Sequence, residues 1–91
     1  MPVNVYVPTA YRDLSKGAAH VMVEGKNVTG VIEALEKSYP GFTERLCDGT
    51  GIKHYINVYI NGEEMRSLQG VETPLKDGDE IAFVPAIAGG V

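Results

Sequence analysis

Hydrophobic and polar residues alternate along two stretches near the start of the chain, residues 3–7 and residues 19–23. The valines of the first stretch occupy every second position, as expected of a strand that buries one face. Pro8 follows and ends that strand, because proline is confined to the edges and ends of sheets. A Lys16-Gly17 turn precedes the second stretch, so the two strands are predicted to pair as a hairpin.

The apolar positions change to a helical spacing in the next segment, residues 28–39. The predicted helix carries one apolar stripe, made of Val28, Val31, Ile32, Leu35 and Tyr39. Asn27 is placed to cap its N-terminus with a side-chain oxygen, and Pro40-Gly41 ends it. We expect a further short helical turn at residues 42–46 and a loop at residues 48–51.

A strictly alternating segment at residues 55–60 gives the clearest strand prediction. One face of it carries Ile56, Val58 and Ile60, and the other carries Tyr55, Asn57 and Tyr59. Asn61-Gly62 follows, which is the pair most typical of a type I′ hairpin turn. The return strand is therefore expected at residues 63–66.

The last predicted strand spans residues 80–85, with Ile81 and Phe83 facing one way. The element order is thus two strands, one helix and three strands, which is the order of an α+β domain of the β-grasp (ubiquitin-like) kind. In that fold the helix covers one face of a mixed sheet, and the first and last strands lie side by side at its centre. We predict a β-grasp domain at residues 1–85 and a flexible C-terminal tail at residues 86–91.

Composition excludes several classes of function. The chain has 91 residues, of which 44% are hydrophobic, enough for one small core. Its net charge is −4 and its basic residues are scattered, so no nucleic acid is expected as a partner. The start of the chain does not resemble a secretory signal, and no apolar stretch approaches the roughly 20 residues that cross a bilayer. The expected location is the cytoplasm, with no membrane as partner.

No arrangement of side chains in the sequence suits catalysis or metal binding. His20 and His54 lie outside any metal-ligand spacing. The single thiol of Cys47 can form neither an internal disulfide nor a cysteine-based metal site, and it is interpreted as a small buried side chain. We therefore expect a protein that is not itself an enzyme and that binds no cofactor and no metal.

Gly89-Gly90, one residue before the end, is the glycine pair that no turn requires. Without Cβ atoms the pair can adopt almost any backbone conformation and can enter a channel too narrow for side chains. A carboxylate on such a thread could be activated in the ATP site of a partner and converted to a thiocarboxylate. The alternative is a frayed terminus without function, since chain ends are usually disordered.

The last fourteen residues before Val91 resemble the end of the MoaD/ThiS sulfur-carrier family. In that family an acidic D-G-D turn enters the last strand, a proline follows, and the chain ends in G-G. The corresponding residues here are Asp77-Gly78-Asp79, Pro85 and Gly89-Gly90. Three other segments also fit MoaD-like members: Arg12-Asp13-Leu14, Ile60-Asn61-Gly62 and Thr73-Pro74-Leu75.

Within this family the chain is most similar to the CysO-type carriers of amino-acid biosynthesis, both in its long segment at residues 38–55 and in its ending Ala86-Ile87-Ala88-Gly89-Gly90. The resemblance implies that Gly90 bears a thiocarboxylate and donates sulfide for cysteine or homocysteine/methionine biosynthesis. It also implies two partners: a ThiF/MoeB-like activating enzyme that uses ATP, and a cysteine or homocysteine synthase that depends on pyridoxal phosphate (PLP).

Val91 departs from the usual ending of the family, because it ties the Gly90 carbonyl up in a peptide bond. Some relatives carry residues after the diglycine that a JAMM-type zinc metalloprotease removes. The resemblance therefore implies that Val91 is cut off before Gly90 is activated, and that the uncut chain is inactive.

Partners are expected to bind the sheet face that the helix leaves open. By alternation that face should carry Tyr6, Tyr59 and Val84, with Met65 beside them, and apolar side chains that cluster on an exposed sheet suggest a docking patch. The alternative is that the tyrosines are ordinary surface residues. The predicted partner-binding set is completed by Pro85 and by the tail residues Ala86, Ile87 and Ala88.

Two other functions stay open. In the first, the chain is the small subunit of a molybdopterin synthase, and its tail hands sulfur over inside the large subunit. In the second, it is a ubiquitin-like modifier or a plain interaction module, since conjugation to a protein begins with the same activation of the C-terminus.

Overall fold

The computed structural model describes residues 2–49 and 51–86. Its strands are β1 (Val3–Tyr6), β2 (His20–Val23), β3 (Cys47–Asp48), β4 (Gly51–Ile52), β5 (Ile56–Ile60), β6 (Glu63–Glu64) and β7 (Glu80–Pro85). Its α-helices are α1 (Val28–Ser38) and α2 (Phe42–Leu46), and its 3-10 helices are η1 (Thr9–Tyr11), η2 (Met65–Ser67) and η3 (Gly70–Glu72).

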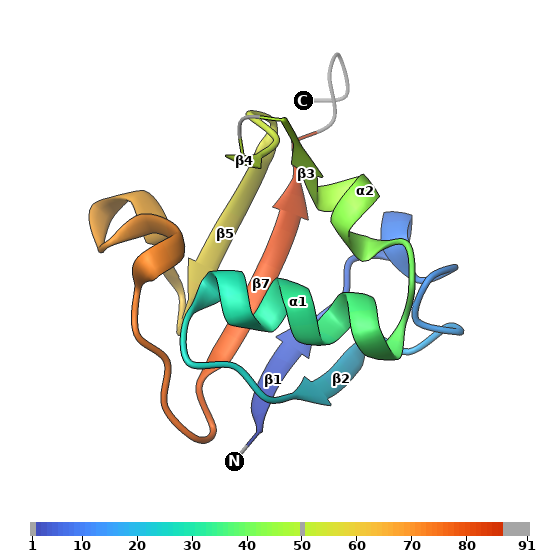
Figure 1. Ribbon diagram of the computed structural model, residues 1–91, viewed down its shortest axis with the longest axis horizontal. Coiled ribbons are helices and arrows are strands. Elements are labelled where there is room, and N and C mark those ends of the chain that lie inside the picture. Colours follow the sequence, from blue (N-terminus) through green and yellow to red (C-terminus); the bar gives the residue numbers. More distant parts are fainter. Residues whose placement is uncertain (1, 50, 87–91) are drawn as a thin grey trace.

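The main sheet has the strand order β2-β1-β7-β5-β6, and α1 crosses one of its faces (Figure 1). β1 and β7 pair in parallel at the centre, and the other neighbours pair antiparallel. A helix packed on one face of such a mixed sheet is the β-grasp arrangement, so the predicted fold and the central pairing of the first and last strands are confirmed.

The core lies between α1 and the sheet. The predicted helical stripe is buried at Val28, Val31, Ile32 and Leu35, whereas Tyr39 is the C-terminal cap and is half-buried. The sheet contributes Val3, Val5, Val7, Val21, Val23, Ile56, Val58, Ile60, Ile81 and Phe83. Full burial of one such side chain stabilises the fold by about 1.5–3 kcal/mol, so the inward rows of the three central strands hold β7 firmly in place.

Two side chains determine how the helices begin. Asn27 caps α1 as predicted, because its Oδ1 accepts a hydrogen bond of 2.8 Å from the N–H of Gly30. Glu36, near the end of α1, accepts hydrogen bonds from the N–H groups of Thr43 (2.9 Å) and Gly41 (3.1 Å) at the start of α2. These bonds hold the pKa of the Glu36 carboxyl below its usual value, and the bond from Thr43 has the larger effect.

The Asn61-Gly62 turn connects β5 and β6 as predicted. Both residues have positive φ, 52° and 87°, as a type I′ turn requires. The side chain of Asn61 also accepts a hydrogen bond of 2.9 Å from the N–H of Glu80 and donates one of 3.1 Å to Asp79. The turn is thereby tied to the beginning of β7.

Three sequence predictions need correction. The return strand expected at residues 63–66 is only Glu63–Glu64, because the chain turns into η2 at Met65. Residues 48–51 were expected to form a loop, but Cys47–Asp48 and Gly51–Ile52 pair as a small second sheet. Strands this short carry no alternating pattern that a sequence could reveal. The second strand also begins at His20, one residue later than expected.

Candidate functional site

The tail starts from the middle of the main sheet. β7 lies between β1 and β5, and the N–H of Ala86 donates a hydrogen bond of 2.6 Å to the carbonyl oxygen of Tyr55. This bond extends the β5–β7 ladder by one residue beyond the pair Ile56–Pro85. Pro85 is half-buried and Ala86 is exposed. The predicted site residues Ile87, Ala88, Gly89, Gly90 and Val91 lie outside the described residues.

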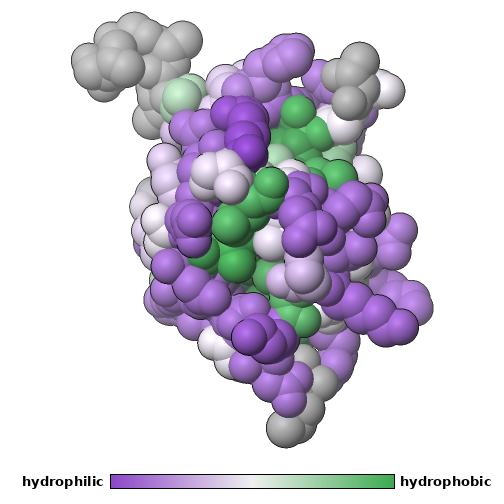
Figure 2. Space-filling view, turned by 90° about the vertical axis from the view of Figure 1, so that its left-hand side faces the viewer, coloured by the Kyte–Doolittle hydropathy of each residue, from purple (hydrophilic) through white to green (hydrophobic). Residues whose placement is uncertain are grey.

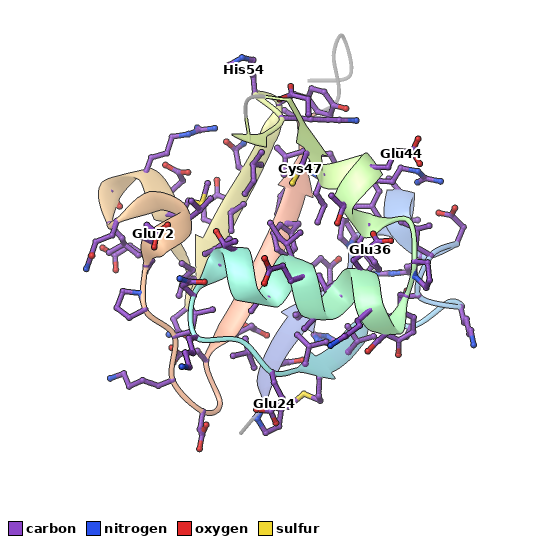
Figure 3. The ribbon with its side chains drawn as sticks, in the orientation of Figure 1. Glu24, Glu36, Glu44, Cys47, His54 and Glu72 are labelled. Carbon is purple, nitrogen blue, oxygen red and sulfur yellow. The ribbon has the colours of Figure 1, made fainter. Side chains whose placement is uncertain are left out.

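The loop before β5 surrounds the point where the chain leaves the sheet. Tyr55 is 49% exposed, and the Nζ of Lys53 lies 6.0 Å from the centre of its ring. His54 is at the same end of the molecule (Figure 3). The start of the tail is therefore flanked by an aromatic ring and a cation. The sequence did not indicate Tyr55, because only the register of β5 against β7 places it beside Ala86.

The open face of the sheet carries three of the four side chains predicted there. Tyr6, Ala82 and Tyr59 are direct cross-strand neighbours on β1, β7 and β5. Val84 lies one step further along β7 and is 37% exposed. The two tyrosines are half-buried. We call this set, Tyr6, Tyr59, Ala82 and Val84, the open-face patch.

Met65 is not on that face, and its predicted placement is wrong. It is only 6% exposed and belongs to the hydrophobic core. The alternation that would place it beside the tyrosines stops at Glu64, where the 3-10 helix η2 begins. Met65 is therefore a packing residue.

Two arginines flank the open-face patch. On one side, Arg12 donates a hydrogen bond of 3.3 Å to the Tyr6 hydroxyl, and its guanidinium lies 5.8 Å from the centre of the Tyr6 ring. On the other side, Arg66 donates a hydrogen bond of 3.5 Å to the Asn57 side chain and lies 3.8 Å from the Glu64 carboxylate. An apolar centre between two guanidinium groups suits a partner surface that is apolar with acidic residues around it.

Cys47 lines a hollow of about 270 Å³ with Ile32, Ile52 and Val71 among its neighbours. Apolar surface is visible on the side of the molecule that carries η2 and η3 (Figure 2). Burial, followed by the nearby Asp48, raises the pKa of the Cys47 thiol, so the sulfur is protonated at neutral pH. The half-buried position agrees with its interpretation as a packing residue.

Other chemistry is not evident in the part of the chain that the structure describes. Within residues 2–49 and 51–86, no three His, Cys, Asp or Glu side chains gather into a group that could hold a metal ion. None of the described helices is both long and apolar enough to pass through a bilayer.

The fold and the site together define a β-grasp domain whose last, central strand leads directly into a diglycine tail. The model of the ThiS family matches residues 5–90, which is nearly the whole chain. The chain belongs to the ThiS family.

Individual relatives are similar over most or all of the chain. The sulfur carrier protein CysO of Mycobacterium tuberculosis is 37% identical over 93 aligned positions, which cover 99% of this chain and 100% of that protein. A crystal structure of the Amycolatopsis orientalis BexX/CysO complex contains a chain with a TM-score of 0.91 and 36% identity, covering 97% of this chain and 99% of that one. Small archaeal modifier protein 3 of Haloferax volcanii is 40% identical over 63 residues, which cover 69% of this chain and 68% of that protein.

Proposed function

We propose that this chain is a cytoplasmic sulfur carrier that donates sulfide from a C-terminal thiocarboxylate on Gly90 to the biosynthesis of cysteine or of homocysteine and methionine. The observation that carries the proposal is the full-length similarity, at 37% identity, to a protein named as the sulfur carrier CysO. The geometry agrees with it, because β7 leads the chain out of the sheet beside an exposed aromatic ring and a lysine.

The proposed chemistry takes place in partner enzymes. The Gly90 carboxylate attacks the α-phosphate of ATP, which forms an acyl adenylate and releases pyrophosphate. A sulfide donor then replaces AMP at the Gly90 carbonyl carbon and leaves a thiocarboxylate. A ThiF/MoeB-like enzyme would catalyse these steps, and a PLP-dependent cysteine or homocysteine synthase would receive the sulfur. The chain itself serves as carrier and co-substrate and holds neither ATP nor PLP.

Val91 must leave before this chemistry can begin, because Gly90 has no free carboxylate while the peptide bond is intact. The match to the ThiS family ends at Gly90, which is consistent with an extra residue after the functional terminus. We propose that water cleaves the Gly90–Val91 bond in a JAMM-type zinc metalloprotease, releasing valine and the Gly90 carboxylate. The zinc would belong to the protease.

The parts of the chain have separate roles in this proposal. The β-grasp domain at residues 1–85 docks on partners through Tyr6, Tyr59 and Val84 of the open-face patch. The tail at residues 86–91 enters the partner's channel, and the partner contacts Pro85, Ala86, Ile87 and Ala88. Gly89 keeps the last part of the tail thin enough to pass.

Mass spectrometry of the protein isolated from its native host tests the proposal. We expect a species that ends at Gly90, and a second one heavier by the replacement of one oxygen by sulfur. A population made up entirely of uncut chains, under conditions that demand cysteine synthesis, would contradict it. The matched control is a Gly90→Pro chain, in which both processed species should be missing.

A second candidate function is protein modification, favoured by the 40% identity to small archaeal modifier protein 3. The activated Gly90 would then form an amide bond to a lysine of another protein, with loss of AMP. Tryptic peptides in which a target lysine carries residues 77–90 as a branch would reveal it, because Lys76 is the last tryptic site before Gly90. Their absence, together with a thiocarboxylate on Gly90, would leave sulfur transfer as the function.

A further inference from the structure

A second surface, away from the tail, has the features of a strand-binding edge. A hollow of about 640 Å³ runs between β2 and α1, and its lining includes Met22, Val23, Gly30 and Ala34. β2 is the outermost strand on this side of the sheet. The hollow therefore lies along the free edge of a strand, with a helix as its opposite wall.

The backbone of β2 offers hydrogen-bonding groups to this hollow. The N–H of Val7 bonds to the carbonyl of Ala19, and Val5 and Val3 oppose Val21 and Val23 in the same register. Antiparallel pairs alternate between bonded and non-bonded, so His20 and Met22 direct their N–H and C=O groups away from β1. Within residues 2–49 and 51–86, no turn or loop donates a backbone hydrogen bond to, or accepts one from, the outward N–H and C=O groups of His20 and Met22.

The two sides of the β2 edge differ in polarity: the open side is apolar and the helix side is mainly acidic. On the open side of the sheet Met22 is 57% exposed, which is the largest exposure of any large hydrophobic side chain in the described chain. The residues that line the hollow include three acidic ones, Glu24, Glu33 and Glu36, and one cation, Lys37, and the Glu36 carboxylate is bonded to the start of α2. Glu24 follows the end of β2, and Glu36 lies on the helix opposite (Figure 3).

We propose that this edge binds an extended segment of a partner protein in which apolar and basic residues alternate. The segment adds a strand to β2 through the backbone of His20 and Met22. Its apolar side chains cover Met22 on the open side, and its basic side chains reach Glu33 on the helix side, because successive side chains of a strand point to opposite faces. A second copy of this chain is a poor occupant, since pairing β2 with itself brings two acidic hollows together.

This surface is independent of the tail and of the open-face patch, so its test does not depend on sulfur transfer. The probe is a short peptide of alternating lysine and valine, added to the full isotope-labelled chain and followed by amide NMR shifts. A peptide of alternating glutamate and valine is the charge-reversed probe. We expect shifts at His20, Met22 and along the facing side of α1, and binding about tenfold or more weaker for the glutamate peptide.

Two variants decide between strand addition and general charge attraction. Met22→Pro removes the outward N–H at a position where an edge strand tolerates proline, and it should abolish the shifts. Glu33→Lys should weaken binding of the lysine peptide about tenfold, whereas Glu44→Lys, the same charge change on α2, should leave it unchanged. If Met22→Pro unfolds the chain, the comparison of Glu33→Lys with Glu44→Lys still tests whether the peptide binds at this edge.

Three results would overturn the proposal: no shifts at millimolar lysine peptide, equal weakening by Glu33→Lys and Glu44→Lys, or full binding by a folded Met22→Pro chain. Sedimentation of the chain alone gives a fourth. A dimer that Met22→Pro dissociates would show that the edge is occupied by a second copy instead.

Discussion

The N–H of Ala86 is held by the carbonyl oxygen of Tyr55 at 2.6 Å, one residue beyond the end of β7. This bond determines where the proposed thread begins. Only residues 87–90 separate Ala86 from the proposed reactive carboxyl, and an extended residue spans at most about 3.6 Å. Gly90 can then reach about 14 Å from the sheet.

This limited reach predicts an asymmetric response to changes in tail length. Deleting Ile87 shortens the thread by about 3.5 Å and should lower the rate of Gly90 adenylation at least tenfold. One extra glycine after Ile87 should change that rate little, because a longer thread can bend and still place Gly90 in the active site. Pyrophosphate release by the activating enzyme measures both, with chains that end at Gly90. Equal rates for the two length variants would show that reach is not limiting.

Processing at Val91 gives a second prediction. A chain that ends at Gly90 should be adenylated without any protease, while the full chain should require one and a chain that ends at Ala88 should never react. All three should have the same thermal midpoint, because the core residues lie before the tail. Adenylation of the full chain by the activating enzyme alone would contradict the proposed order of events.

The open-face patch predicts a selective loss of partner binding. Val84→Asp places a charge on the patch and should weaken binding to the activating enzyme at least tenfold. Leu68→Asp is a matched control, since Leu68 is also 37% exposed but lies next to η2, outside the patch. Calorimetric titration measures both affinities. Similar losses in the two variants would place the docking surface elsewhere.

The corrected position of Met65 predicts an effect on stability. Met65→Ala should lower the free energy of unfolding by about 2–5 kcal/mol, as truncation of a buried methionine does. Val84→Ala, on the exposed patch, should change it by less than about 0.5 kcal/mol. Urea denaturation distinguishes them. A neutral Met65→Ala chain would mean that Met65 is not packed in the core in solution.

The lowered pKa of Glu36 predicts that the stability of the fold depends on pH. Hydrogen bonds from Thr43 and Gly41 lower its pKa below the ordinary value of 4.5. A carboxyl with a lowered pKa in the folded state stabilises the fold above the unfolded pKa, and this contribution is lost as the pH falls through the folded pKa. The thermal midpoint of Glu36→Gln should therefore lie below that of the parent at pH 7, and the gap should close below about pH 4.

Glu33→Gln serves as the control for that experiment. Glu33 is exposed on the same helix, and no hydrogen bond joins its side chain to another residue in the described ranges. At pH 7 its thermal midpoint should lie close to that of the parent. A gap for Glu36→Gln that persists into acid would indicate a packing defect rather than a lost carboxylate.

Local signals explain which parts of the fold could be predicted from sequence. Asn27, Asn61-Gly62 and the alternation in β5 and β7 each act within a few neighbouring residues, and all of them gave the right element. Glu36 bonds to the next helix, and Tyr55 bonds to Ala86 across 31 positions of sequence. Such contacts depend on the angle between elements and on strand register, which no local pattern contains.

The choice of Gly89-Gly90 as the candidate site has a different basis, and it stays a prediction. Gly89-Gly90 and the acidic turn before β7 form a short motif that does not depend on tertiary structure. Met65 was misplaced because a period-two pattern does not show where a strand stops, and the chain leaves the sheet after Glu64. Arg12 was not recognised as a neighbour of Tyr6, since it reaches the patch from outside the strands that carry it.

The parallel pairing of β1 with β7 also has a mechanical consequence. Because both strands run in the same direction, the chain enters this pair at one end of the molecule and leaves it at the other (Figure 1). A pull between the two ends would therefore load the hydrogen bonds between β1 and β7 in shear, all at once, instead of opening them one after another. The domain should therefore resist unfolding when force is applied to both of its ends.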